Sequence, residues 1–284
     1  MNVDLHCHSS VSDGTLAPAA VAARARAHGV EIWSLTDHDE VGGQAEAAGA
    51  AADLGMRFIP GVEISVTWAG HTVHIVGVGI DPADETLVRG LAATRNGRAD
   101  RARRMAASLA RVGIEGAFEG ALHYVGNPDL ISRTHFARFL VERGVCRNVS
   151  DVFERYLSEG KPGYEPMQWA TLTNAIAWIR GAGGIAVLAH PGRYDLDDLG
   201  LSALIDDFRG LGGRGIEVIT GSHTPDEYVK FAGIARATGL LASRGSDFHS
   251  PDESNVELGE LPDLPADLTP VWSELLARPA MSAA

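Results

Sequence analysis

Short apolar stretches recur along the chain and alternate with longer segments of helical periodicity. Strands are predicted for seven of these stretches: 3–6, 31–36, 57–66, 72–79, 185–189, 215–219 and 240–244. Several are nearly continuous apolar runs, which is typical of parallel strands covered on both faces. Helices are predicted for the alanine-rich segments 17–28, 43–54, 172–182 and 226–238. This alternation predicts an α/β fold, either a barrel or an open doubly wound sheet.

One long segment, residues 84–166, interrupts the alternation. It reads as helices and loops without a convincing strand. Since the alternation resumes afterwards, we predict a small helical subdomain that caps the substrate site. It would be inserted into one discontinuous sheet-forming domain, residues 1–83 and 167–284. The last residues, ARPAMSAA (277–284), are expected to form a loose tail.

Composition narrows the classes of protein that need to be considered. The 284-residue chain has a formal net charge of −13, which argues against broad nonspecific binding of nucleic acid. Its two cysteines, Cys7 and Cys146, make no disulfide framework. The sequence lacks an apolar run of 18 residues and a signal-peptide pattern. We therefore expect a cytoplasmic protein without a membrane partner or an obligate protein partner.

Histidine and acidic residues lie at or just after the ends of the predicted strands. His6 and His8 are two residues apart, so their side chains can point to the same side, and Asp13 follows them. Later strand ends supply Asp37, His38, Glu63, His71, His74, His190, Asp247 and His249. Each alone reads as a surface or turn residue, but together they predict a polynuclear metal site, because chemistry in α/β barrels gathers at the carboxyl ends of strands. Mixed histidine and carboxylate ligands suit Zn²⁺, Mn²⁺ or Fe²⁺.

The ordered set of motifs resembles the PHP (polymerase and histidinol phosphatase) family, which lies within a broader amidohydrolase-like group. The resemblance rests on His6-x-His8 with Asp13, TDH ending at His38, GVE ending at Glu63, AHP with His190, and SDFH at 246–249. It implies a distorted (β/α)₇ TIM-like barrel. It also implies two or three divalent metal ions, with Mn²⁺ expected first and Zn²⁺ or Fe²⁺ as alternatives.

The family's ligand pattern, carried over residue by residue, implies three metal sites. The first would use His6, His8, Glu63 and Asp247. The second would share Glu63 and add His74 and His190, and the third would use Asp13, His38 and His249.

Three neighbouring residues compete for roles in these sites. His74 is preferred over His71 because His74 lies within an apolar strand pattern, whereas His71 follows Gly70 in an expected turn. Asp37 is expected to orient a ligand rather than to bind metal. Cys7 should point away from its histidine neighbours and pack.

The resemblance implies hydrolysis of phosphoesters. Clustered divalent metals make a hydroxide nucleophile available near neutral pH and neutralise the phosphate. Asp13 and His38 are the candidate catalytic residues, as donors of a proton to the leaving oxygen.

The inserted segment suggests which phosphoester is bound. Residues 89–111 hold seven arginines and one aspartate, and most of these arginines are expected to lie on a solvated helix face. Residues 129–140 resemble the SRxH element of one PHP subgroup. We expect Arg133 to bind a second, non-reacting phosphate, because arginine reads phosphate through paired hydrogen bonds. Further candidates for substrate contact are His135, Lys161 and His223.

That subgroup includes phosphatases that remove the 3′-phosphate of nucleoside 3′,5′-bisphosphates, and this is the function we expect for a small phosphorylated nucleotide substrate. Four alternatives stay open. They are a 5′-3′ oligoribonuclease acting on short 5′-phosphorylated RNA, a histidinol-phosphate phosphatase, an amide hydrolase of the amidohydrolase-like group, which would leave the arginines unexplained, and a non-enzymatic, metal-stabilised interaction module.

Overall fold

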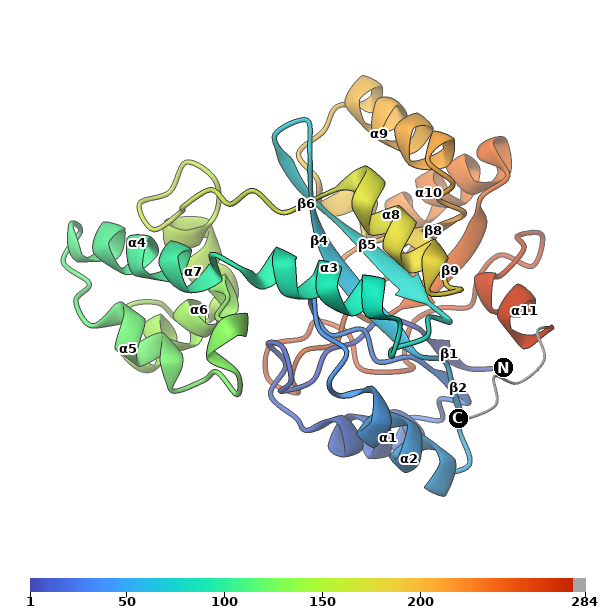
Figure 1. Ribbon diagram of the computed structural model, residues 1–284, viewed down its shortest axis with the longest axis horizontal. Helices are drawn as coiled ribbons and strands as arrows, with labels where there is room; N and C mark the ends of the chain where they lie inside the picture. The colour runs from blue at the N-terminus through green and yellow to red at the C-terminus, as the bar shows by residue number, and fades with distance from the viewer. Residues whose placement is uncertain (278–284) are drawn as a thin grey trace.

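The computed structural model describes residues 1–277 and shows an α/β fold with two sheets (Figure 1). A parallel three-stranded sheet contains β1 (Val3–Asp4), β2 (Ile32–Trp33) and β3 (Arg57–Phe58). The larger sheet has the order β6 (Ala170–Thr171), β4 (Gly61–Trp68), β5 (His71–Val78), β7 (Ile185–Leu188), β8 (Gly215–Thr220) and β9 (Leu241–Gly245). The predicted α/β class is confirmed. Of the predicted tail, residues 278–284 lie outside the described residues.

The two sheets meet at their edges through short contacts rather than through one continuous ladder. Isolated bridges join Cys7 to Phe248 and His38 to Glu63. The first strand also lies beside the last, since Leu5 N donates to Arg244 O (3.1 Å). The result is a distorted barrel whose strand ends converge on the segments that carry the histidines.

Strands β4 and β5 correct one expectation from the sequence. The predicted strand 57–66 is divided between the two sheets around Pro60, which has no N–H to donate to a ladder. Strand β5 runs antiparallel to both β4 and β7, although mainly parallel pairing was expected. Ala69 and Gly70 form the whole connection between β4 and β5 and have φ values of 46° and 87°. A two-residue turn with positive φ at both positions makes a hairpin, and a hairpin is antiparallel.

The helices cover the sheets on their outer faces and fill one insertion. Those of the barrel are α1 (Pro18–Ala27), α2 (Gln44–Asp53), α3 (Glu85–Arg95), α8 (Leu172–Gly181), α9 (Asp198–Gly210), α10 (Pro225–Thr238) and α11 (Val271–Leu276). The four predicted helices correspond to α1, α2, α8 and α10. Within residues 1–277 the helices are too short or too polar to cross a membrane.

The inserted segment forms a helical lobe beside the barrel, on the left of Figure 1. It contains α4 (Arg98–Ala110), α5 (Ala117–Leu122), α6 (Arg133–Glu142) and α7 (Val149–Val152), with short helical turns at 128–130 and 153–157. Buried residues of 102–157 make a core cluster of their own, whereas Leu87 and Leu91 of α3 belong to the main core. The division of the chain at residues 84 and 166 stays a prediction, and by packing α3 lies with the barrel.

Candidate active site

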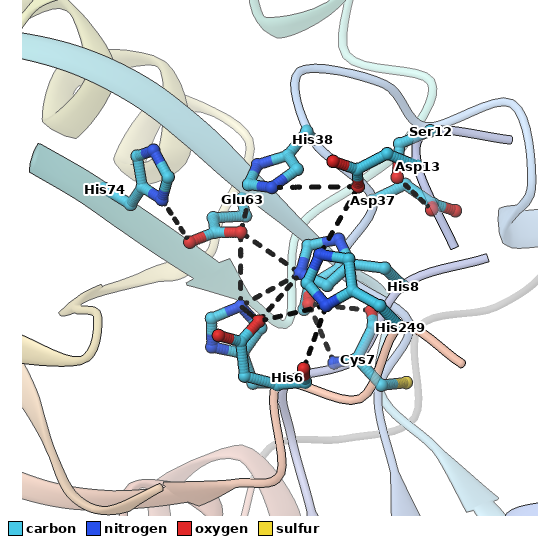
Figure 2. A network of polar contacts seen from close by, with 12 residues as sticks. His6, Cys7, His8, Ser12, Asp13, Asp37, His38, Glu63, His74 and His249 are labelled. Carbon is cyan, nitrogen blue, oxygen red and sulfur yellow. Dashed lines mark hydrogen bonds and ion pairs between the residues drawn. The ribbon is translucent and has the colours of Figure 1, made fainter. Parts of the chain in front are cut away.

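His6 and His8 lie just beyond β1 and are fully buried (Figure 2). Their Nε2 atoms are 3.2 Å apart, and each lies 3.2 Å from Glu63 Oε2. Asp247, which follows β9, places Oδ1 3.5 Å from His6 Nε2 and 3.3 Å from His8 Nε2. The four side chains offer one ligand atom each, all within 4.8 Å of one another. The structure therefore brings the first predicted ligand set together.

Glu63 lies at the centre of the cluster. Its Oε1 is 2.8 Å from His74 Nδ1 and 3.0 Å from His190 Nε2, while its Oε2 is 3.0 Å from His38 Nδ1. The carboxylate thus faces the first and second predicted sets at once, as a bridging ligand must. His71 pairs with Trp68 at the end of the hairpin and takes no part in these contacts.

Asp13, His38 and His249 form a third group together with His8. Asp13 Oδ1 lies 3.4 Å from His249 Nε2 and 3.9 Å from His38 Nε2. The His8 ring stacks between the other two imidazoles, with centroids 4.4 Å from His38 and 4.1 Å from His249. The nine residues of the predicted metal site therefore converge.

The donor atoms of these groups fit divalent metal ions. Several are buried and have no hydrogen-bond partner among the described residues, namely Asp13 Oδ1, Glu63 Oε2 and the Nδ1 atoms of His38 and His74. Burying unpaired polar atoms costs free energy, and a bound cation would satisfy them. Mixed nitrogen and oxygen donors in this number are typical of transition-metal sites.

The pKa values of the buried side chains also favour a site for divalent cations. Burial alone would raise the pKa of Glu63, but the surrounding His38, His6 and His74 hold it well below its usual range. Burial would lower the pKa of His8, but Asp247 and Glu63 raise it to about 10. Surrounding carboxylates also raise the pKa of His6 well above its usual value, although burial opposes this. Protons on His6 and His8 therefore stand in for the positive charge that the carboxylates require, and metal binding would release them.

The two predicted proton donors gain no support from their environments. Although burial opposes it, His38 and His249 hold the pKa of Asp13 well below its usual range, so this carboxylate stays ionised. Burial holds the pKa of His38 well below 6.5, so this imidazole is neutral. An ionised carboxylate and a neutral imidazole suit metal ligation better than proton donation at neutral pH.

Glu217 is a residue that the motif pattern did not reveal. It lies on β8, is 1 % exposed, and places Oε1 2.8 Å from His6 Nδ1. Its Oε2 accepts a hydrogen bond from His190 N at 2.6 Å. One buried carboxylate thus orients His6 and fixes the backbone of His190, which has a strained φ of 25°. Its position inside the apolar run GIEVI was the available signal.

Asp37 and Cys7 lie beside the ligands without facing them. Asp37 accepts hydrogen bonds from Ser9 N (2.8 Å), Ser9 Oγ (2.7 Å) and Ser12 Oγ (2.6 Å). It therefore orders the loop between His8 and Asp13 instead of contacting a ligand side chain. Cys7 is fully buried and receives a hydrogen bond from Trp33 Nε1, so it packs away from the histidines as expected.

A cavity lies beside the candidate metal ligands and is lined by residues of both the barrel and the inserted lobe. Its other lining residues are Ser65, Thr72, Arg98, Arg101, Ser132, Arg133, Thr134, Phe153, Trp169 and Arg193. Arg133 was predicted to lie here, whereas Arg98 and Arg101 of α4 and Arg193 were not. Four guanidinium groups thus share one cavity with the candidate metal ligands.

The other three predicted substrate contacts are placed differently. His135 is fully buried, and its Nδ1 accepts a hydrogen bond from Ser132 N at the start of α6. The His223 ring makes contacts with the backbone: Nε2 accepts from Gly192 N (3.0 Å) and Nδ1 lies 3.2 Å from Val218 O. Lys161 is exposed and is not among the residues that line the cavity. These contacts give His135 and His223 structural roles, and the placement of the three residues offers no support for phosphate binding.

Residues 4–157 match the family description "PHP domain", which covers more than half of the chain. The chain belongs to the PHP family. This PHP protein is 54% identical over 277 residues to the 3′,5′-nucleoside bisphosphate phosphatase of Chromobacterium violaceum, covering 98% of this chain and 97% of the relative. It is 42% identical over 271 residues to the 5′-3′ exoribonuclease Rnm of Escherichia coli, covering 95% and 92%.

Solved structures agree with this membership. A structure described as an amidohydrolase from Chromobacterium violaceum, with bound sulfate and no metal, matches the PHP protein with a TM-score of 0.95 and 53% identity, covering 98% of this chain and 96% of the other. A protein of Bifidobacterium adolescentis, described as a metal-dependent phosphoesterase, matches with a TM-score of 0.79 and 31% identity, covering 96% and 94%. The ligand-rich centre of this PHP protein is therefore that of a metal-dependent phosphoesterase family.

Proposed function

We propose that the protein hydrolyses the 3′-phosphate of nucleoside 3′,5′-bisphosphates, converting adenosine 3′,5′-bisphosphate into 5′-AMP and phosphate. The observation that carries this proposal is the pair of guanidinium groups of Arg101 and Arg133, which line the cavity beside the metal ligands and have no carboxylate partner among the described residues. The 54% identical relative that bears this name supports the same substrate class.

Arg101 is 6 % exposed, and its Nε donates a hydrogen bond only to the Glu165 carbonyl (2.7 Å). Burial, with Arg133 and Arg98 nearby, lowers the pKa of Arg101 to about 9, so it remains charged at neutral pH. A buried positive charge without an anionic partner is costly. A second phosphate on the substrate would supply that anion through charge-assisted hydrogen bonds.

Aromatic side chains hold these guanidinium groups in place. The Arg133 guanidinium lies 5.4 Å from the centre of the Phe153 ring, and that of Arg101 lies 5.5 Å from the Trp169 ring. The Arg98 guanidinium also lies over Trp169, 4.6 Å from the ring centre, but it is ion-paired to Asp39, so its charge is already balanced. The two unpaired groups, Arg101 and Arg133, are therefore the proposed site of the non-reacting phosphate.

The reacting phosphate would lie over the candidate metal ligands, with Mn²⁺ the proposed ion. When bound, divalent ions would activate water and neutralise charge on the phosphate. Glu63 and Asp247 orient the histidines on the barrel side, while the arginines position the substrate from the lobe side. A histidinol phosphate has only one phosphate and would leave Arg101 and Arg133 unpaired, which counts against that alternative.

The direct test incubates Mn²⁺-loaded protein with adenosine 3′,5′-bisphosphate, 5′-AMP, histidinol phosphate and a 5′-phosphorylated dinucleotide. It measures phosphate release from the first three and formation of mononucleotides from the dinucleotide. We expect fast release from the bisphosphate, with 5′-AMP accumulating. Comparable release from 5′-AMP or histidinol phosphate would contradict a requirement for two phosphates. Absence of phosphate from the three monoesters together with absence of mononucleotides from the dinucleotide would overturn the proposal and favour the non-enzymatic alternative.

A second candidate function is 5′-3′ exoribonuclease activity on short RNA, which the 42% identical Escherichia coli relative favours. A terminal 5′-phosphate could occupy the arginine pair while the next phosphodiester lies over the metals. Cleavage of the dinucleotide at a rate equal to or above bisphosphate hydrolysis would favour this candidate over the first.

A further inference from the structure

The two oxygens of the Asp13 carboxylate face different parts of the fold, helix α6 and the histidine cluster. Its Oδ2 accepts hydrogen bonds from Thr134 Oγ1 (3.0 Å) and Ser132 Oγ (3.2 Å) at the start of α6. Its Oδ1 is buried without a hydrogen-bond partner among residues 1–277 and points toward His249 and His38. The two hydroxyl groups thus fix the rotation of the carboxylate and leave one oxygen directed into the third predicted ligand set.

Arg138, further along α6, extends this contact. It is 8 % exposed, and its Nη2 donates a hydrogen bond to the carbonyl oxygen of Asp13 (2.7 Å). Its Nε and Nη2 also donate to the two oxygens of Glu253, at 2.7 Å each. Glu253 lies in the turn that follows His249, and the Ser254 Oγ of that turn accepts from His249 N (2.8 Å). One helix therefore holds the segments of two ligands, Asp13 and His249.

The other ligand sets are supported from the barrel. Glu217 of β8 orients His6 and holds the backbone of His190, and the described hydrogen bonds of Glu63 and Asp247 do not involve α6. Helix α6 itself is anchored in the separate core of the inserted lobe through Phe136 and Leu140. The third ligand set, unlike the other two, is therefore supported by a helix that packs into the core of the inserted lobe.

We propose that α6 sets the occupancy of the Asp13–His38–His249 metal site, so that the inserted lobe controls one ion of the centre and leaves the others to the barrel. Thr134, Ser132 and Arg138 are positioning residues in this arrangement. The inference rests on the proposed three-metal ligand set. Because binding and positioning are reciprocal, an ion at this site in turn stabilises the docking of α6 against the barrel.

The test is a count of bound Mn²⁺ ions per chain by equilibrium dialysis at a series of free Mn²⁺ concentrations, without substrate. Thr134→Val removes the hydroxyl group with little change in volume, and Thr134→Ser retains it. We expect wild type and Thr134→Ser to bind three ions alike. In Thr134→Val one ion should bind about 10- to 100-fold more weakly, the range for loss of a group that orients a ligand, with the other two unchanged.

Three outcomes would overturn the inference. They are unchanged binding by Thr134→Val, an equal weakening of all ions, and a wild-type protein that binds only two ions at saturation; the last would refute the ligand set as well. Since no substrate is present, a protein that binds three ions but does not hydrolyse the bisphosphate would refute the proposed function alone.

Ser132→Gly provides a second variant should Thr134→Val not fold. Glycine is well tolerated at the N-cap position, so the helix start is preserved while the second hydroxyl group is lost. This variant should weaken the same ion and leave the other two unchanged. Urea unfolding of the metal-free variants checks that each one is folded, and unchanged binding by a folded Ser132→Gly would contradict the role of the α6 hydroxyl groups.

Discussion

The side chains that line the cavity carry different charges on its two sides. On the barrel side the carboxylate oxygens of Glu63, Asp13 and Asp247 face imidazole nitrogens, and on the lobe side Arg101 and Arg133 present guanidinium groups without carboxylate partners. A molecule with one phosphate for each side matches both. Residues predicted from motifs supplied the first kind of charge. Of the second kind, Arg133 was predicted from the SRxH element, and Arg101 came from no recognisable motif.

Arg101→Met tests the role of the second phosphate. We expect kcat/KM for adenosine 3′,5′-bisphosphate to fall about 10- to 100-fold, because a hydrogen bond to a charged group contributes about 1.5–3 kcal/mol. Hydrolysis of an aryl phosphate, which has a single phosphate, should change far less. Arg103→Met is the matched control, since Arg103 lies on the same helix and its side chain is 60 % exposed. Equal losses on both substrates would assign Arg101 to the fold or to the reacting phosphate.

Glu217→Gln tests whether the buried carboxylate beside His6 tunes the metal centre. Glutamine retains the shape but not the charge that orients His6, so Mn²⁺ affinity should fall about 10- to 100-fold in a titration followed by calorimetry. Glu274→Gln, on α11 at the surface, should bind Mn²⁺ like wild type. If Glu217→Gln also binds normally, the carboxylate holds only the backbone of His190.

At the scale of elements, the residues that begin α6 both cap the helix and line the cavity. Ser132 caps the helix, and the His135 Nδ1 accepts from Ser132 N in return. Arg98 and Arg101 of α4 lie on one helical face with Ala102, Met105 and Leu109, all buried. Their spacing of three, four and seven residues was visible in the sequence and was the signal that these two arginines, unlike Arg103, face inward.

His135 makes the stability of the fold sensitive to acid. Burial lowers the pKa of His135 to about 4, whereas in the unfolded chain it is near 6.5. Its contribution is therefore fully present above pH 6.5 and is lost as the pH falls toward 4, because the unfolded chain then binds one more proton. Near pH 5 the free energy of unfolding therefore falls by about 1.4 kcal/mol more, for each unit by which the pH is lowered, than it would without this histidine.

Urea unfolding of wild type and His135→Gln at pH 5, 6 and 7 measures this slope. Glutamine at position 135 does not titrate, so the variant should show a slope that is shallower by about one proton between pH 5 and 6. Parallel curves for the two proteins would mean that His135 does not remain neutral in the fold.

The elements also show which features a sequence can predict. The convergence of candidate ligands such as His6, His38 and His190 could be predicted because each follows a recognisable strand, and strand ends meet in a barrel. The antiparallel β5 was missed because its direction depends on the two positive φ angles of Ala69 and Gly70, which an apolar run does not encode. Contacts between α6 and Asp13 were missed because they depend on how the lobe docks, and local periodicity carries no such information.

At the scale of the whole molecule, the candidate metal centre joins segments that are far apart in the sequence. Its candidate ligands lie in β4 and β5 and in the segments that follow β1, β2, β7 and β9. A chelator such as EDTA should therefore lower the melting temperature. An ion present at 100 times its Kd stabilises by about 2.7 kcal/mol, which corresponds to roughly 5–10 °C for a protein of this size.

Differential scanning calorimetry before and after dialysis against EDTA checks this expectation. Added Mn²⁺ should restore the original melting temperature, and added Na⁺ at equal ionic strength should not. A melting temperature that stays constant while the metal content falls to zero would show that the ions contribute nothing to the stability of the fold.

The pairing of the first strand region with the last has a consequence for how the protein is made. Asp247 N donates to His6 O (2.8 Å) and His8 N to Phe248 O (2.8 Å), so ligands about 240 positions apart meet only after the intervening chain is in place. A nascent or truncated chain that lacks residues 247–249 has no complete first or third set, because Asp247 belongs to the first and His249 to the third. The proposed sites of these two sets can therefore form only once nearly the whole chain has been made, and a full metal content would distinguish finished chains from truncated ones.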